Sequence, residues 1–146
     1  MFRVIIAGCR TYDDYDSLKA YADYKLSRID DDIEIVSGGA RGADTLGERY
    51  AKEKGYSIKR FPAEWEKYGR SAGPRRNEAM ARYADALLAY WDGESRGTKN
   101  MIELAKEHGL KVGVYQYRTG TEKERYCISI VSKETYQEKV SKPIDK

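Results

Sequence analysis

Short apolar runs alternate with amphipathic stretches along most of this chain. Five runs rich in β-branched and aliphatic residues predict strands at 2–8, 33–37, 56–61, 86–91 and 111–115. Apolar residues spaced by three and four positions predict helices at 15–29, at 43–54, from near 75, and at 98–108. Strands and helices that alternate at short spacing favour an α/β fold. We predict a doubly wound, mainly parallel five-stranded sheet with helices on both faces and right-handed crossovers.

Two regions depart from this alternation. Residues 61–74 fit no regular pattern, and a connection of that length in a compact domain is usually functional. After a polar loop at 118–124, residues 126–131 alternate enough to predict an extra strand at the sheet edge. The lysine- and glutamate-rich residues 133–146 predict a charged tail or a short helix. We therefore predict one domain over 1–132, followed by this C-terminal tail.

Composition narrows the class of protein. The chain has 146 residues with 27 basic and 24 acidic side chains, and this net charge of +3 is too balanced to argue for nucleic acid. No apolar run is long enough to span a membrane and the N-terminal run is too short for a signal peptide, so we expect a cytoplasmic protein. Cys9 and Cys127 suggest neither a disulfide framework nor a metal site, and we expect no metal and no cofactor. Thirteen tyrosines raise the expectation of self-association.

Loops that pair glycine with arginine follow three of the predicted strands, and a fourth basic segment begins a helix. These segments are Gly8–Arg10, Gly39–Gly42, Arg96–Gly97 and Arg75–Asn77. Because the carboxyl ends of parallel strands meet at one edge of a sheet, the segments should converge there, where the strand order reverses. The planar donor fork of arginine suits a phosphate, so we predict an anion-binding site. The alternative is that the arginines are ordinary surface charges and the glycines only form turns.

The segment 37–44, Ser-Gly-Gly-Ala-Arg-Gly-Ala-Asp, is the most informative of these loops. Its glycines let the backbone approach a ligand, and the free N–H groups of the following helix should point at that ligand. The segment lacks the G-x-G-x-x-G spacing of dinucleotide loops and the Gly-Lys-Ser/Thr of a Walker A loop. These differences argue against hydride transfer and ATP-driven phosphoryl transfer, and favour a phosphate or nucleotide-type site.

Acidic and aromatic side chains near the same edge each have two interpretations. Asp44 either caps its helix or binds a ribose hydroxyl or an arginine. Asp92, at the end of a predicted strand, is a candidate for ligand contact. Trp65 and Tyr68 could stack on a base or close the pocket, whereas the alternative for Trp65 is that it anchors its loop to the core.

Five segments of the chain, in order, resemble the SLOG superfamily, which joins the LOG-type phosphoribohydrolases with the DprA/Smf DNA-processing proteins. Within it, the chain is most similar to the small YspA/YpsA-related branch. The resemblance spans roughly residues 2–117 and rests on 8–10 (Gly-Cys-Arg), 37–44, 61–65 (Phe-Pro-Ala-Glu-Trp), 73–80 (Gly-Pro-Arg-Arg-Asn-Glu-Ala-Met) and 91–98 (Trp-Asp-Gly-Glu-Ser-Arg-Gly-Thr). It implies a Rossmann-like fold, a homodimer or higher homo-oligomer, and a role in phage or bacterial signalling.

The chain departs from the LOG enzymes at the residue that matters for catalysis. Of their Arg-Lys-x-x-Met motif it keeps Arg76 and Met80, but Met101 stands where the resemblance places their catalytic glutamate. Cleavage of an N-glycosidic bond needs a carboxylate to stabilise the cationic centre or to activate water, and methionine does neither. Either Asp92 or Glu94 has taken over this role together with Arg76, or the site binds without cleaving.

The leading hypothesis is therefore a protein that binds a nucleotide or a nucleotide-derived small molecule, with ADP-ribose-type signals as one class. The alternatives are a LOG-type phosphoribohydrolase and a DprA-like DNA-binding protein, although the near-neutral charge makes nucleic acid an unfavoured partner. The predicted ligand-contact residues are Gly8, Arg10, Gly38, Gly39, Ala40, Arg41, Gly42, Asp44, Trp65, Arg76, Asn77, Asp92, Ser95, Arg96, Gly97 and Thr98.

Overall fold

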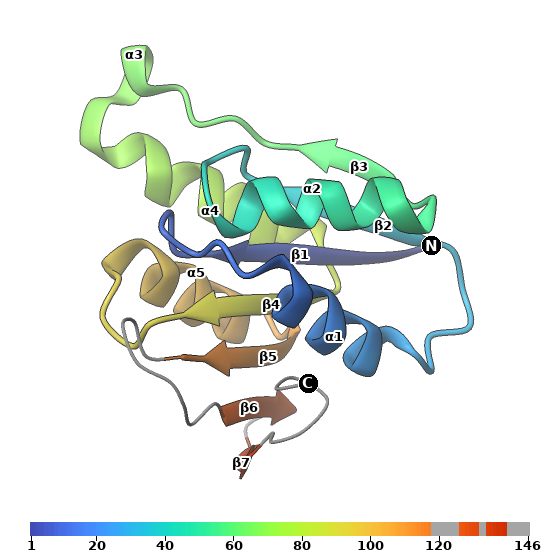
Figure 1. The fold of residues 1–146 in the computed structure, drawn as a ribbon. Helices are drawn as coiled ribbons and strands as arrows, with labels where there is room; N and C mark the ends of the chain where they lie inside the picture. The colour runs from blue at the N-terminus through green and yellow to red at the C-terminus, as the bar shows by residue number, and fades with distance from the viewer. Residues whose placement is uncertain (118–125, 132–133, 140–146) are drawn as a thin grey trace.

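A seven-stranded sheet forms the centre of the protein in a computed structural model, which describes residues 1–117 and the backbone of 126–131 and 134–139 (Figure 1). The strand order is β3-β2-β1-β4-β5-β6-β7. Their bounds are β1 Phe2–Gly8, β2 Ile33–Ser37, β3 Ser57–Arg60, β4 Ala86–Trp91, β5 Lys111–Gln116, β6 Tyr126–Val131 and β7 Glu134–Lys139. The first five strands are parallel, which confirms the predicted doubly wound, Rossmann-like α/β sheet.

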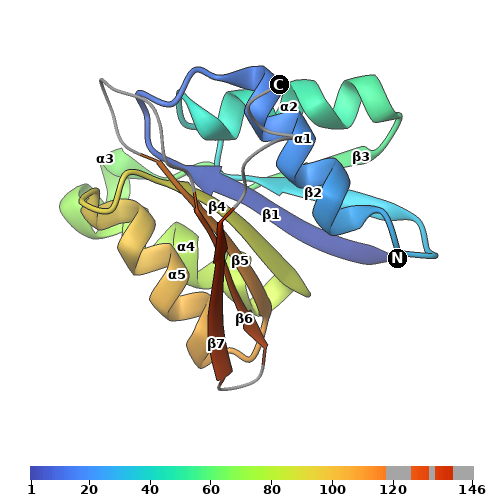
Figure 2. The same cartoon turned by 60° about the horizontal axis from the view of Figure 1, so that its bottom comes forward.

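Helices cover both faces of the sheet (Figure 2). On one face, α1 (Tyr15–Leu26) packs with α2 (Ala43–Lys54), and on the other α4 (Ala72–Tyr83) packs with α5 (Arg96–Glu107). Each pair covers its own apolar cluster, built around Val4 and Ile6 on one face and Ile5 and Leu87 on the other. Adjacent residues of β1 thus enter opposite cores, as the two-residue period of a strand requires.

The irregular segment predicted at 61–74 contains two short turns of helix, α3 (Trp65–Tyr68) and the 3₁₀ turn η1 (Gly69–Ser71). The following helix, α4, begins at Ala72 rather than near Arg75. Pro74 is compatible with this start because the N–H groups of a helix's first turn have no partner within the helix. Likewise α5 begins at Arg96 instead of residue 98, which puts Arg96 and Gly97 in its first turn.

The C-terminal part extends the sheet further than the sequence predicts. The extra strand predicted at 126–131 is β6, and it lies antiparallel beside β5. The prediction of a tail or short helix over 133–146 is wrong for Glu134–Lys139, which forms β7 and pairs with β6. Thr and Tyr in this segment favour strands, and β6 offers an edge of unpaired backbone groups. The predicted loop at 118–124 lies outside the described residues, and the domain boundary at 132 stays a prediction.

Tyrosines fill the core between α1 and the sheet. Tyr21, Tyr90 and Tyr115 are fully buried, with ring centroids 5.4–5.7 Å apart. The Tyr90 hydroxyl donates to the Leu18 carbonyl at 3.0 Å, and the Tyr50 hydroxyl donates to Asp23 at 2.6 Å. Internal packing thus explains much of the tyrosine content. Self-association stays a prediction, and the number of tyrosines no longer supports it. None of the helices in the described part of the chain has the length and apolar character needed to cross a membrane.

Candidate nucleotide site

A cavity of about 670 Å³ opens at the carboxyl edge of the sheet, beside the ends of β1 and β4. β1 lies between β2 and β4, and the strand order reverses at this point of the sheet. Open α/β sheets bind their ligands at such a reversal, outside the carboxyl ends of the strands. The loops after β1, β2 and β4 and the start of α4 meet here, as the sequence predicts. Twelve of the predicted residues line the cavity: Gly8, Arg10, Ala40, Asp44, Trp65, Arg76, Asn77, Asp92, Ser95, Arg96, Gly97 and Thr98.

A second cavity of about 650 Å³ adjoins the first. Of the predicted residues that do not line the first cavity, Gly38, Gly39 and Arg41 line the second. Gly42 lines neither cavity: at φ +77° it packs under the β1–α1 loop, where a Cβ would lie 2.3 Å from the Cys9 carbonyl oxygen. Glu94 is exposed and lines neither cavity either. Among the lining residues that the sequence analysis missed, Asn100 had a signal, because it lies one helical turn after Arg96.

The chain's own oxygens engage the glycine loop after β2. Ala40 N–H donates to a carboxylate oxygen of Asp44 at 3.2 Å, and Gly39 N–H donates to Ser37 Oγ at 3.0 Å. The sequence predicts that the glycines let the backbone approach a phosphate and that N–H groups of the following helix point at it. Ligand binding by these two N–H groups would require displacement of Asp44 or Ser37.

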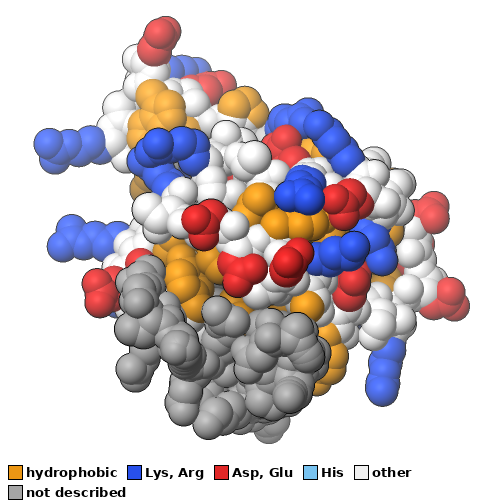
Figure 3. Space-filling model, viewed as in Figure 1, with side chains coloured by type: hydrophobic (Ala, Val, Ile, Leu, Met, Phe, Trp, Pro, Cys, Tyr) orange, Lys and Arg blue, Asp and Glu red, His pale blue; other side chains and the backbone are white. Residues whose placement is uncertain are grey.

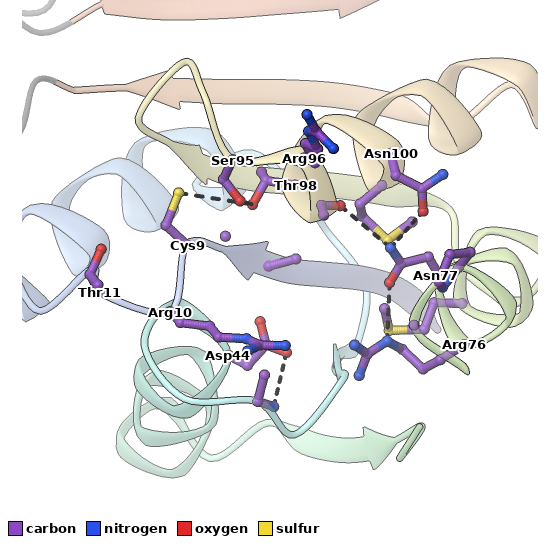
Figure 4. A pocket seen from close by; sticks show the side chains of 18 of the residues that line it. Cys9, Arg10, Thr11, Asp44, Arg76, Asn77, Ser95, Arg96, Thr98 and Asn100 are labelled. Atoms are coloured by element: carbon purple, nitrogen blue, oxygen red, sulfur yellow. Dashed lines mark hydrogen bonds between the residues drawn. The ribbon is translucent and has the colours of Figure 1, made fainter. Parts of the chain in front are cut away.

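Asp44 is buried, with 5% of its surface exposed, and lines the first cavity (Figure 4). Burial raises the pKa of its carboxyl from 3.8 to about 6, although the Ala40 N–H and the Arg76 charge oppose that rise. The carboxyl therefore takes up its proton at a higher pH than an exposed aspartate does. Its hydrogen bond to Ala40 holds the glycine loop and does not cap α2, whose N-cap Gly42 makes no side-chain cap hydrogen bond. Its place in the lining leaves a contact with ligand open.

This raised pKa predicts a pH-dependent stability. Between pH 4 and 6 the folded carboxyl holds a proton that the unfolded one has lost, so stability falls as pH rises through that window, by up to about 3 kcal/mol. Asp44→Asn keeps an oxygen acceptor for Ala40 but does not titrate. We expect the wild-type protein to lose about 2 kcal/mol relative to Asp44→Asn between pH 4.5 and 7.5 in urea unfolding. A difference between the two proteins that does not change with pH would contradict this burial.

Arg76 connects α4 to the glycine loop. Its Nη1 donates to the Gly38 carbonyl oxygen at 2.6 Å, and its Nε donates to Asn77 Oδ1 at 3.0 Å. Asn77 in turn donates to Asn100 Oδ1 on α5 at 2.9 Å. Burial lowers the pKa of Arg76, while Asp44 raises it. This hydrogen-bonded series joins the loop after β2 to α4 and α5 at the cavity wall.

The loop after β4 directs the first turn of α5 at the same cavity. Asp92 Oδ1 accepts from the N–H groups of Glu94 and Ser95, each at 2.9 Å, which fixes the turn before the helix. Burial raises the pKa of Asp92, but these N–H donors outweigh it and the net pKa is lowered. The N-cap residue Ser95 makes no side-chain cap hydrogen bond. Figure 4 shows Ser95, Arg96 and Thr98 across the cavity from Arg10 and Asp44.

Met101 belongs to the apolar core and also lines the cavity, with 1% of its surface exposed. A buried thioether therefore occupies the position at which the resemblance places a catalytic glutamate. The carboxylates that do line the cavity are Asp44 and Asp92, both held by backbone N–H groups. Among the described residues, no cluster of potential metal ligands is present.

Comparison with known proteins identifies the family of this chain. The family model described as the YspA, cpYpsA-related SLOG family matches residues 2–68, which include the loops after β1 and β2. The Gene 61 protein of Mycobacterium phage D29 is 37% identical over 119 residues, which cover 77% of this chain and 94% of that protein. The chain belongs to the YspA, cpYpsA-related SLOG family. The motifs of α4 and of the β4–α5 loop lie beyond the residues that the family model matches.

A solved structure extends the likeness of this SLOG-family chain to its fold. DNA processing protein A (DprA) from Streptococcus pneumoniae superposes with a TM-score of 0.58 at 17% sequence identity. The match covers 77% of this chain and 49% of DprA, so the chain spans about half of the DprA length. At this identity the match concerns the fold alone.

Proposed function

We propose that this protein binds a nucleotide or nucleotide-derived small molecule in the cavity at the ends of β1 and β4, with a phosphate at the first turn of α5. The observation that carries the proposal is the N-terminus of α5, which has no side-chain cap and opens on a cavity lined by Arg10, Arg76 and Arg96. The N–H groups of a first helical turn and the helix dipole both favour an anion. Lys and Arg side chains lie at this edge of the molecule, and others are spread over the rest of the face shown (Figure 3).

Trp65 supports a nucleotide over a simple phosphate. It is 51% exposed and belongs to neither apolar core cluster, which favours a stacking surface over an anchor of its loop. It lines both cavities, and its ring lies 3.5 Å from the position of a Cβ on Gly73 at the start of α4. An exposed aromatic ring beside an anion site offers a stacking surface for a base.

Trp65→Ala is expected to weaken nucleoside monophosphate binding by about 5- to 100-fold, because a stacked base contributes about 1–3 kcal/mol. Isothermal titration calorimetry measures this change. The free energy of unfolding of Trp65→Ala should change little, since the Trp65 side chain is exposed. Tyr68→Ala is the matched control, because Tyr68 lies on the same short helix and lines neither of the two cavities. Equal losses in both variants would contradict a specific stacking role.

Hydrolysis of an N-glycosidic bond is a second candidate. Asp44 and Asp92 line one cavity while their surroundings push their pKa values in opposite directions, a pattern typical of acid and base pairs. In this role Asp92, ionised, would stabilise the cationic sugar, and Arg76 would bind the phosphate. Chromatography of nucleoside monophosphates after incubation would show free base that Asp92→Asn no longer releases. The same nucleotides recovered intact favour binding alone.

A further inference from the structure

The second cavity continues the first along the outside of the glycine loop. The two share Arg10, Ala40, Trp65 and Arg76, and the second reaches from there over Gly39 and Arg41 to Pro62 and Ala63. Each cavity is within the range of about 300–1,000 Å³ that holds a small-molecule ligand. A nucleoside monophosphate in the first cavity would therefore leave a second space of similar size beside it.

Charge distinguishes the two cavities. In the part of the chain that the structure describes, the residues that line the second cavity include Arg10, Arg41 and Arg76 and no acidic side chain. In the first cavity, three arginines face Asp44 and Asp92. The second cavity therefore attracts an anion without the opposing carboxylates that the first contains.

The backbone around Arg41 holds this arginine at the second cavity. Gly39 and Gly42 adopt φ angles of +76° and +77° on either side of it, which most other residues avoid. Thr45 Oγ1 donates to the Ala40 carbonyl at 2.9 Å, and Ala43 N–H donates to the Cys9 carbonyl at 3.2 Å. Arg41 itself is exposed, so its guanidinium can reach a ligand.

We propose that the ligand carries two phosphates separated by a nucleoside, as a 5′-phosphorylated dinucleotide does, and that Arg41 binds the second phosphate. This inference rests on the proposed function, since it assumes a first phosphate at α5. Trp65 and Arg76 belong to both cavities and would contact the middle of such a ligand. The chemistry that recognises it is thus one helix N-terminus, one aromatic ring and arginines on both sides.

The test is calorimetric titration, at about 0.15 M salt, with the four nucleoside 5′-monophosphates, the matching 5′-phosphorylated dinucleotides and 20-nucleotide single strands. We expect the best dinucleotide to bind at least about tenfold more tightly than its monophosphate, because a charge-assisted hydrogen bond is added. Arg41→Ala should remove that gain and leave monophosphate binding within about twofold. The control is Arg70→Ala, an exposed arginine that lines neither cavity and should change neither affinity.

Each of the other outcomes would overturn a specific part of the proposal. Monophosphates that bind as tightly as dinucleotides would overturn the second phosphate site and leave the proposed function intact. A dinucleotide gain that survives Arg41→Ala would overturn the role of Arg41. Affinity that keeps rising with strand length would replace the dinucleotide with single-stranded nucleic acid. An absence of binding by every ligand would overturn both this inference and the proposed function.

Discussion

Replacement of Arg76 by alanine is expected to weaken nucleoside monophosphate binding by about 100-fold and to lower the free energy of unfolding by about 1–3 kcal/mol. Binding falls because Arg76 supplies a positive charge to both cavities. Stability falls because the Gly38 carbonyl loses its donor and the buried Asp44 loses its cationic neighbour. Calorimetry and urea unfolding measure the two effects separately.

Arg75→Ala is the matched control. Arg75 is the adjacent residue of α4 but is exposed, donates to Ser71 Oγ at 3.1 Å and lines neither cavity, so both measurements should change little. Arg76→Lys should retain part of the binding, because the charge remains while the planar fork is lost. Undiminished binding by Arg76→Ala would contradict the proposed site.

Gly42→Ala is expected to lower the free energy of unfolding by about 3 kcal/mol or more. An alanine at a φ of +77° and a ψ of −127°, which residues other than glycine rarely adopt, costs about 1–3 kcal/mol in backbone strain. Its Cβ would also lie 2.3 Å from the Cys9 carbonyl oxygen and 2.5 Å from that of Arg10, which forces the β1–α1 loop away from α2. Such overpacking typically costs a further 1–3 kcal/mol.

Gly39→Ala separates these two causes. Gly39 has nearly the same φ of +76°, but a Cβ there meets nothing within 4 Å. It should lose only the strain, about 1–2 kcal/mol. Urea unfolding of both variants gives the comparison. Equal losses would mean that the contact between the glycine loop and the β1–α1 loop is looser than the structure has it.

The strands were predictable because each buried parallel strand is a nearly continuous apolar run, as in β1 and β4. Helix starts were harder to predict. Gly73 and Pro74 suggested a loop, yet both fit the first turn of α4, and α5 begins at Arg96, two residues earlier than expected. The sequence did not predict β7 because its lysines and glutamates are typical of a helix. What makes it a strand is its pairing with β6, which the composition of the segment does not encode.

Convergence of the arginine-bearing loops could also be predicted, because parallel topology alone brings strand ends together. The hydrogen bonds of the glycine loop could not be predicted. That Asp44 binds the Ala40 N–H depends on how α2 leaves the loop, and no spacing in the sequence encodes it. The second cavity was missed for a similar reason, since it forms where residues 62–65 lie beside the glycine loop.

The most direct measurement of the central claim is calorimetric titration of the wild-type protein with the four nucleoside 5′-monophosphates and with the corresponding nucleosides. We expect at least one monophosphate to bind saturably at one site, and its nucleoside to bind at least about tenfold more weakly, because the phosphate at α5 contributes charge-assisted hydrogen bonds. Absence of heat with every monophosphate, or equal affinity for a nucleoside and its monophosphate, would contradict a phosphate-binding nucleotide site at the ends of β1 and β4.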